Sequence, residues 1–330
     1  MASLLRSLPV ALFAALLLLP GCSEKKAGGE ASTTDSVPTI GFAQIVEDAS
    51  LDEARFGFLD ALKEAGYEEG KGTLRVLYRN AGGDAAALTQ ILDYFIGQKA
   101  KLIGANTTQV MIAAANRTKE IPIFMMVAPS PEIAGLTKPG TAAQPNLLGT
   151  YETLAYIDTS VTLIRTLFPK AKRVGTIYNS SEPNSANALA RLRAMCTSLG
   201  LELVEVPVTA TSETQQAAQS IAARGIDVFF ALPDNVMFSS FETVTKALND
   251  AHVPIISSEA GLVKRGALAA YGADFRAWGH QAGVAAARFL KSGKAEPSML
   301  ELVTVRKRVV NTEAAARLGV AVPQGFEPMR

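Results

Sequence analysis

The chain of 330 residues lacks the groups on which most catalytic and metal sites depend. It has only two cysteines, Cys22 and Cys196, and two isolated histidines, His252 and His280. A disulfide framework or a zinc site needs more such side chains at closer spacing. The sequence also has no Walker loop, no Gly-x-Ser-x-Gly elbow and no His-Glu-x-x-His motif. We therefore expect no catalytic residue, no cofactor and no metal ion.

An excess of charge of one sign is also missing. Lysine and arginine number 32 against 31 for aspartate and glutamate, so the formal net charge is +1. Nucleic-acid-binding domains usually carry a basic excess, and we expect no nucleic-acid partner here. The chain is nevertheless long enough for a large core and for two domains.

A long hydrophobic run is confined to the N-terminus. Arg6 precedes the apolar residues 8–20, and Gly21 and Cys22 follow. This order predicts a bacterial signal peptide over residues 1–21. The run is shorter than the roughly 20 residues of a transmembrane helix. A cysteine directly after the small residue resembles the lipobox of bacterial lipoproteins, although it is also compatible with a chance cysteine near an ordinary cleavage site.

Lipidation of Cys22 would hold the mature chain at a bacterial membrane, facing the extracytoplasmic space. The pattern leaves open whether that space is the periplasm or the cell surface. Residues 22–36 contain no aromatic side chain and almost no large apolar one, so we expect a flexible tether.

From residue 38 onward, short apolar segments alternate with amphipathic ones, an alternation typical of right-handed βαβ units in doubly wound parallel sheets. The apolar segments read as strands buried on both faces. The expected strands are 39–46, 74–80, 101–106, 121–128 and 146–151, then 173–179, 202–209, 228–233, 253–259 and 267–273.

The two series of strands resemble one another. Residues 104–114 (GANTTQVMIAA) align without a gap onto residues 230–240 (FALPDNVMFSS), and each segment leads into a similar strand. This internal similarity favours two lobes of like fold. We expect lobe 1 at 37–151 plus 275–300 and lobe 2 at 157–271 plus 303–330, with crossings near Glu152, Gly272 and Leu302.

Ligands of open parallel sheets bind beyond the carboxyl ends of the strands, and two facing lobes would form a cleft there. Polar residues follow most of the expected strands. Serine, threonine, asparagine and aspartate are also the preferred helix N-caps, so we expect roughly half of these residues to be caps only. The candidate ligand-binding residues are Gln44, Asn106, Thr107, Thr108, Ser130, Tyr151, Tyr178, Asn179, Ser180, Ser181, Asn184, Asp234, Asn235, Glu259 and Asp274.

This set would suit a zwitterion such as an amino acid. Helix N-termini at 107–108 and 180–181 would offer N–H donors to a carboxylate. Asp234, Glu259 or Asp274 would balance an ammonium group. Tyr151, Tyr178 and Phe42 would supply an aromatic wall. The alternative is a sugar or nucleoside, with in-plane hydrogen bonds from Asn106, Asn179 and Asn235.

Four stretches carry a resemblance to a known family: IGFAQIVEDASLDEARFGFLDALKEAGYEEGK, VGTIYNSSEPNS, TSETQQAAQS and GALAAYGADF. They resemble the ABC-transporter substrate-binding lipoproteins of the tryptophan/tyrosine type, from about residue 38 to the C-terminus. The resemblance implies a type I periplasmic-binding-protein fold with two lobes and three crossovers. It also implies closure around the ligand, which is an aromatic or other apolar amino acid in characterised members, and a partner permease with its ATPase. Since catalytic motifs are also missing, we expect a non-catalytic, monomeric receptor for an aromatic or apolar amino acid.

Two departures from the family pattern concern the expected cleft. Pro129-Ser130-Pro131 stands where the family often has Thr-Asp-Pro, and Asp48 stands where it often has histidine. Loss of one acid and one imidazole near the cleft could change the ligand that binds. Two other functions stay open: a sensor that passes the closed state to a membrane kinase, and an enzyme that uses Asp234, Glu259 or Asp274 as acid or base.

Overall fold

A computed structural model describes residues 37–303, 305–322 and 324–329. The expected signal peptide, the expected lipidation site Cys22 and the expected tether lie outside the described residues. Within the described ranges, we find no helix with the length and apolar character that a membrane span requires.

The first lobe is built on a parallel sheet of six strands in the order β11-β5-β4-β3-β1-β2. The register aligns the ends of three adjacent strands, β3, β1 and β2, because Gln44 lies beside both Asn80 and Asn106. The strands are β1 (Thr39–Gln44), β2 (Arg75–Asn80), β3 (Ile103–Asn106), β4 (Ile123–Met126), β5 (Leu147–Tyr151) and β11 (Leu300–Leu302).

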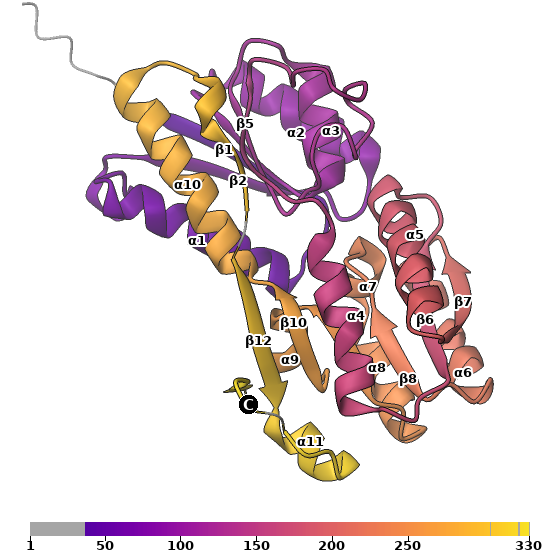
Figure 1. The fold of residues 1–330 in the computed structure, drawn as a ribbon. Helices are drawn as coiled ribbons and strands as arrows, with labels where there is room; N and C mark the ends of the chain where they lie inside the picture. Colours follow the sequence, from indigo (N-terminus) through magenta and orange to yellow (C-terminus); the bar gives the residue numbers. More distant parts are fainter. Residues whose placement is uncertain (1–36, 304, 323, 330) are drawn as a thin grey trace, which may run out of the picture. The chain divides into compact units, whose positions relative to one another are not determined.

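Two helices of the first lobe pack unusually closely, α1 (Ala49–Glu64) and α10 (Phe275–Ser292) (Figure 1). A Cβ atom at Gly279 would lie 1.9 Å from the carbonyl oxygen of Ala54, so only glycine permits this approach. The lobe also contains α2 (Ala85–Gly97), α3 (Thr108–Arg117) and the short 3₁₀ helices η1 (Glu69–Lys71) and η3 (Pro297–Met299).

The second lobe is built on a sheet of seven strands in the order β13-β12-β10-β9-β8-β6-β7. Its pairs are parallel except that β12 runs antiparallel to β10. The strands are β6 (Arg173–Asn179), β7 (Glu202–Val208), β8 (Val228–Ala231), β9 (Ile255–Glu259), β10 (Ala269–Ala273), β12 (Arg306–Asn311) and β13 (Glu327–Met329).

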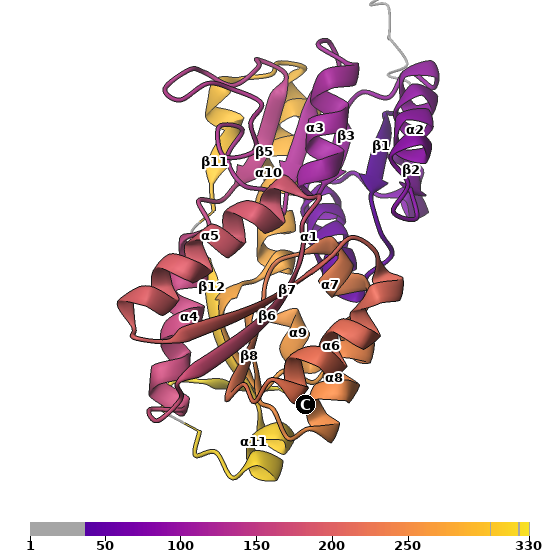
Figure 2. The same ribbon diagram turned by 90° about the vertical axis from the view of Figure 1, so that its right-hand side faces the viewer.

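Helices cover both faces of the second sheet. Figure 2 shows α4 and α5 on one side of it and α6 and α8 on the other. The helices are α4 (Ala155–Leu167), α5 (Pro183–Ser198), α6 (Thr214–Ala223), α7 (Asn235–Ser239), α8 (Phe241–Asp250), α9 (Gly261–Lys264) and α11 (Thr312–Leu318), with the 3₁₀ helix η2 (Thr211–Glu213).

The chain passes between the two sheets three times: after β5, after β10 and after β11. The similar segments found in the sequence form β3–α3 and β8–α7, and each strand lies third from the β2 or β7 edge of its sheet. These features confirm the predicted fold class, α/β with two doubly wound parallel-sheet lobes joined by three crossovers.

Candidate functional site

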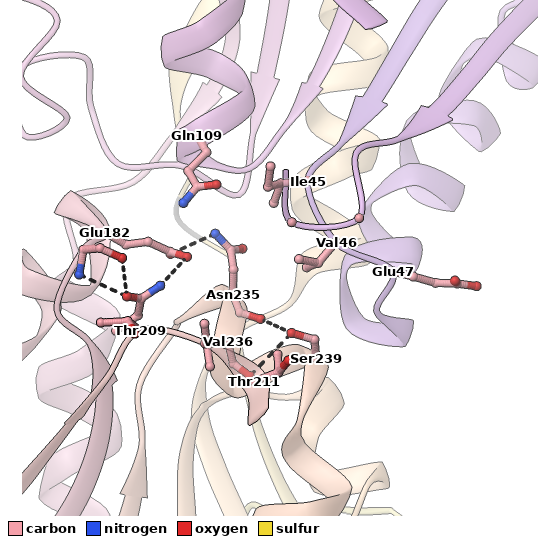
Figure 3. A pocket seen from close by; sticks show the side chains of 15 residues that line it. Ile45, Val46, Glu47, Gln109, Glu182, Thr209, Thr211, Asn235, Val236 and Ser239 are labelled. Atoms are coloured by element: carbon pink, nitrogen blue, oxygen red, sulfur yellow. Dashed lines mark hydrogen bonds between the residues drawn. The ribbon is translucent and has the colours of Figure 1, made fainter. Parts of the chain in front are cut away.

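Two cavities lie where residues of both lobes meet beyond the carboxyl ends of the strands. The outer cavity has a volume of about 500 Å³, within the range usual for small-molecule sites, and is drawn in Figure 3. The inner cavity has about 20 Å³, room for a single water molecule. Asn235, at the start of α7, lines both.

The outer cavity is lined mainly by polar groups. The Glu182 carboxylate accepts hydrogen bonds of 2.9 Å from the amide nitrogens of Asn179 and Asn235 (Figure 3). Burial, and then the nearby Asp234 carboxylate, raises the pKa of Glu182 to about 7. Gln109 of α3 extends toward the same space from the first lobe. Within residues 37–303, 305–322 and 324–329, the lining offers amide and carboxyl groups but no lysine, arginine or histidine.

The inner cavity has an aromatic wall. Tyr156, Phe238 and Trp278 line it and are almost fully buried. The rings of Tyr156 and Trp278 meet edge to face with centroids 5.4 Å apart. The indole Nε1 donates to the Val305 carbonyl at 3.0 Å, which fixes the ring orientation. These rings come from the first crossover, α7 and α10, and strand-end reasoning did not find them.

Backbone strain is concentrated around the inner cavity. Among the described residues, five non-glycine residues have positive φ, and three of them line this cavity: Thr107 at 92°, Val127 at 51° and Leu154 at 61°. Two are β-branched, for which such φ values are strongly disfavoured. Strained residues of this kind occur at ligand clamps, where the surrounding structure holds them.

Two buried side-chain oxygens at the inner cavity have no hydrogen-bond partner, Thr107 Oγ1 and Asn184 Oδ1. Leaving such atoms unpaired costs about 1–3 kcal/mol each, and a polar ligand would satisfy them. Thr107 is the N-cap residue of α3, yet its side chain makes no capping bond. The first N–H groups of α3 are therefore available to an anion.

Glu152 is the acidic group of the inner cavity, at a position that was expected only as a crossing point between the lobes. It follows β5 and is 4% exposed. The Leu154 N–H donates to its Oε2 atom. Burial raises the pKa of Glu152 to about 8, although that hydrogen bond and the charges of Arg191 and Arg306 act in the opposite direction.

The structure uses the expected ammonium-binding acids in other ways, and none of them lines either cavity. Asp234 caps α7 and accepts from Asn179 N at 2.6 Å, Ser185 Oγ at 2.5 Å and Met237 N at 3.0 Å. These three bonds occupy most of the roughly four lone-pair sites of the Asp234 carboxylate. Its pKa is raised, with burial as the main cause.

Glu259 and Asp274 are likewise engaged by the protein. Glu259 accepts from the N–H groups of Gly261 and Leu262, and burial raises its pKa to about 7. Asp274 caps α10 and pairs with Lys307 at 3.0 Å. Both acids thus stabilise helix starts away from the two cavities.

The expected aromatic wall is placed elsewhere. Phe42 is fully buried in the core of the first lobe and packs against Phe58 at 5.5 Å. Tyr151 and Tyr178 lie at the ends of β5 and β6 and line neither cavity. The aromatic residues that do line a cavity are those described above.

The remaining expected residues divide into two groups. Gln44, Asn106, Ser130 and Ser180 line neither cavity. Gln44 and Asn106 are fully buried and bonded to each other at 3.1 Å, the Ser130 hydroxyl accepts from Ile133 N, and Ser180 N donates to Val208 O. The expected residues that line a cavity are Thr107, Thr108, Asn179, Ser181, Asn184 and Asn235.

Comparison with known proteins explains this architecture. The model of the family described as ABC transporter substrate binding protein matches residues 39–326. The chain belongs to this family. Its members are solute-binding proteins and not enzymes, so the absence of catalytic motifs in the sequence has a direct explanation.

Individual relatives bind aromatic amino acids. The tyrosine-binding protein of Clostridioides difficile (strain R20291) is 38% identical over 279 residues, which are 83% of this chain and 80% of the relative. The crystal structure of an ABC domain in complex with L-Trp from Streptococcus pneumonia has a TM-score of 0.80 at 26% identity and covers 89% of this chain and 100% of that one.

A third relative differs in state. It is the ligand-free, open structure of a substrate-binding protein with adhesive properties from Clostridium difficile, which covers 89% of this chain and 99% of its own. Its TM-score is 0.65 at 31% identity. The present structure is thus more similar in shape to the Trp complex than to the open structure, although its sequence is more similar to that of the open structure.

Proposed function

We propose that this chain is the extracytoplasmic lipoprotein receptor of an ABC importer, and that it captures an aromatic amino acid in the inner cavity. The observation that carries the proposal is the convergence, on one cavity, of three strained residues, two unpartnered polar oxygens and an aromatic wall. The strained backbone and the unpaired oxygens cost free energy, and contacts with an aromatic zwitterion would offset that cost. The aromatic wall would contact the ring of the same ligand.

The carboxylate of the ligand would bind at the N-terminus of α3. There the Thr107 hydroxyl and the N–H groups of Thr108 and Gln109 are available, and the helix dipole favours a negative charge. The ring would insert between Tyr156, Phe238 and Trp278, where edge-to-face contacts favour an aromatic partner.

The inner cavity is too small for an amino acid as it stands, since about 20 Å³ is far below the usual size of a ligand site, roughly 300–1,000 Å³. We infer a collapsed, closed arrangement without ligand. The greater similarity to the Trp complex than to the open relative supports this inference. Hinge motion would open the cavity, and the ligand would shift the population to a closed state in which the cavity is wide enough to hold it.

The delivery role follows from the family, in which such receptors act with a membrane permease and its ATPase. We propose that the monomeric receptor is held at the membrane through lipid on Cys22, and that its two lobes have the boundaries expected from the sequence. Replacing Cys22 by Ala should release the protein into the soluble fraction; unchanged membrane attachment would contradict the anchor.

The outer cavity favours a second candidate ligand, a sugar or a nucleoside. Its amide and hydroxyl lining, including Asn179, Asn235 and Ser181, matches the hydrogen-bonding edges of such solutes. A sensor role, in which the closed state signals to a membrane kinase, is compatible with the same geometry. Neighbouring genes for a permease and an ATPase would support transport over sensing.

A thermal-shift screen against amino acids, sugars and nucleosides tests the proposal. A ligand at 100 times its dissociation constant stabilises the folded state by about 2.7 kcal/mol, a readily measured shift. We expect tyrosine, tryptophan or phenylalanine to give the largest shift. A response to sugars or nucleosides alone would remove the amino-acid assignment and leave only the family's transport role.

A further inference from the structure

We propose that the Glu152 carboxylate binds the protonated amine of the ligand, so that the inner cavity selects an aromatic solute with a cationic nitrogen over an aromatic acid of the same shape. The inference rests on the proposed function and adds the residue that determines this selectivity.

Glu152 is a buried acid that has no cationic partner within the cavity. It is 4% exposed, and it lines the inner cavity together with Tyr156 and Trp278. Among the described residues, the Leu154 N–H is the single hydrogen-bond donor to its carboxylate, and it reaches only Oε2. In the part of the chain that the structure describes, no lysine, arginine or histidine lines either cavity. An ammonium group from the ligand would therefore supply the missing charge.

The other buried acids of the cleft are already satisfied. Both Glu182 oxygens accept from amide groups, those of Asn179 and Asn235. Asp234 accepts from three neighbours within 3.0 Å. Since a bound ammonium needs free lone pairs, Glu152 is the acid best prepared for it.

The charges around Glu152 do not offset the cost of burying its ionised carboxylate. The charge of Arg191 in α5 lowers the pKa of Glu152, but Arg191 makes no hydrogen bond to it. The Arg191 guanidinium instead donates two hydrogen bonds of 2.6 Å to Asp158. Arg306 of β12 is exposed, and the buried Tyr156 of α4 is neutral because burial raises its pKa well above the usual value.

Proton release should accompany binding. Burial holds the pKa of Glu152 at about 8, so the free carboxyl carries its proton at pH 7. An ammonium group beside it stabilises the ionised form and lowers that pKa. The O–H bond of Glu152 then breaks, the proton passes to solvent, and the carboxylate pairs with the unchanged ammonium of the ligand.

Calorimetry on the full chain, purified in detergent, tests the inference with matched pairs of ligands. L-tryptophan and L-tyrosine are compared with 3-(indol-3-yl)propanoic acid and 3-(4-hydroxyphenyl)propanoic acid, which lack only the amine. Titrations at pH 6.5 in two buffers of different ionisation enthalpy should show release of nearly one proton per amino acid and none per acid. The acids should bind at least about 30-fold more weakly.

Two variants complete the experiment. Glu152→Gln keeps an acceptor for the Leu154 N–H, and it should abolish both the proton release and the preference for the amine. Glu259→Gln, a matched change of a buried acid that lines neither cavity and accepts from Gly261 N and Leu262 N, should keep both. Loss of the preference in Glu259→Gln but not in Glu152→Gln would overturn the assignment.

The outcomes separate the inference from the function on which it rests. If the wild-type protein binds amino acids and desamino acids equally, or releases no proton, Glu152 does not select the amine and the aromatic-binding function survives. If neither class binds while another solute does, the proposed function fails and the inference fails with it.

Discussion

Arg265 donates a hydrogen bond from Nη1 to Asp48 Oδ2 at 2.5 Å, and this contact joins the second lobe to the first. Asp48 is the N-cap of α1, and its other oxygen accepts from Ser50 N and Leu51 N. Arg265 also donates to the carbonyl of Phe238, a residue of the aromatic wall, at 2.7 Å. The pair therefore connects closure of the lobes to the wall of the inner cavity.

Asp48→Asn should weaken ligand binding by about tenfold, because losing roughly 1.4 kcal/mol from the closed state lowers the population competent to bind. Glu242→Gln is the control, since Glu242 also pairs with Arg265 but its side chain is 66% exposed. It should change affinity little. Isothermal titration measures both, and equal effects of the two variants would contradict a lobe-to-lobe role.

A second prediction concerns the aromatic wall of Tyr156, Phe238 and Trp278. Phe238→Leu should reduce the affinity for aromatic amino acids by about tenfold, through loss of ring contacts worth roughly 0.5–1.5 kcal/mol beyond area. Tyr178→Leu should leave the affinity unchanged, because Tyr178 lines neither cavity. Competition binding with labelled tyrosine compares the two variants, and the reverse ranking would favour the wall expected from the sequence.

A third prediction concerns the unpaired hydroxyl of Thr107. Thr107→Val removes a buried oxygen that has no partner, at nearly constant shape. The ligand-free protein should be as stable as wild type or more so, by up to about 1 kcal/mol, while ligand binding weakens. Chemical denaturation and titration on the same samples check both signs. Lower stability with unchanged affinity would show that the hydroxyl has only a structural role.

Stability of the ligand-free protein should fall as pH rises from 5 to 8. The pKa values of Glu182 and Glu259 are raised to about 7 and that of Glu152 to about 8, above the ordinary value of 4.5. Between pH 4.5 and 8 the folded state therefore binds more protons than the unfolded state, and raising pH favours unfolding.

Thermal melts across this range should show a decline of at least about 4 °C. The acids whose pKa is lowered, Glu68, Glu213 and Glu242, act mainly below pH 4.5 and do not reverse the trend. Glu152→Gln should flatten the dependence. A melting temperature that rises toward pH 8 would contradict the protonated state of these carboxyls.

The fold was largely predictable because its determinants are local. Strands β1 to β10 coincide with the ten segments expected as strands, most of which are short apolar runs with polar ends, and the Asp48 side chain caps the helix after β1. Strands β11, β12 and β13 were not predicted. They are three to six residues long and partly exposed, so they have no continuous apolar run, and β12 gains its place by antiparallel pairing with β10.

The site was predictable only in part, because proximity across lobes does not leave a local pattern. Thr107 and Asn184 follow strands and were identified by that rule. Phe238 and Trp278 lie one turn inside helices from different parts of the chain, and Glu152 lies in a crossover. The buried strand-end acid Asp234 was assigned to the ligand, but its oxygens satisfy the N–H and hydroxyl groups of the second lobe.

The most direct test of the central claim is a crystal structure of the protein grown with L-tyrosine or L-tryptophan. We expect the ligand's ring to lie between Tyr156, Phe238 and Trp278, and the ligand's carboxylate to lie at the start of α3. A ligand seated only in the outer cavity, on Glu182 and Asn235, with the inner cavity still collapsed, would contradict it.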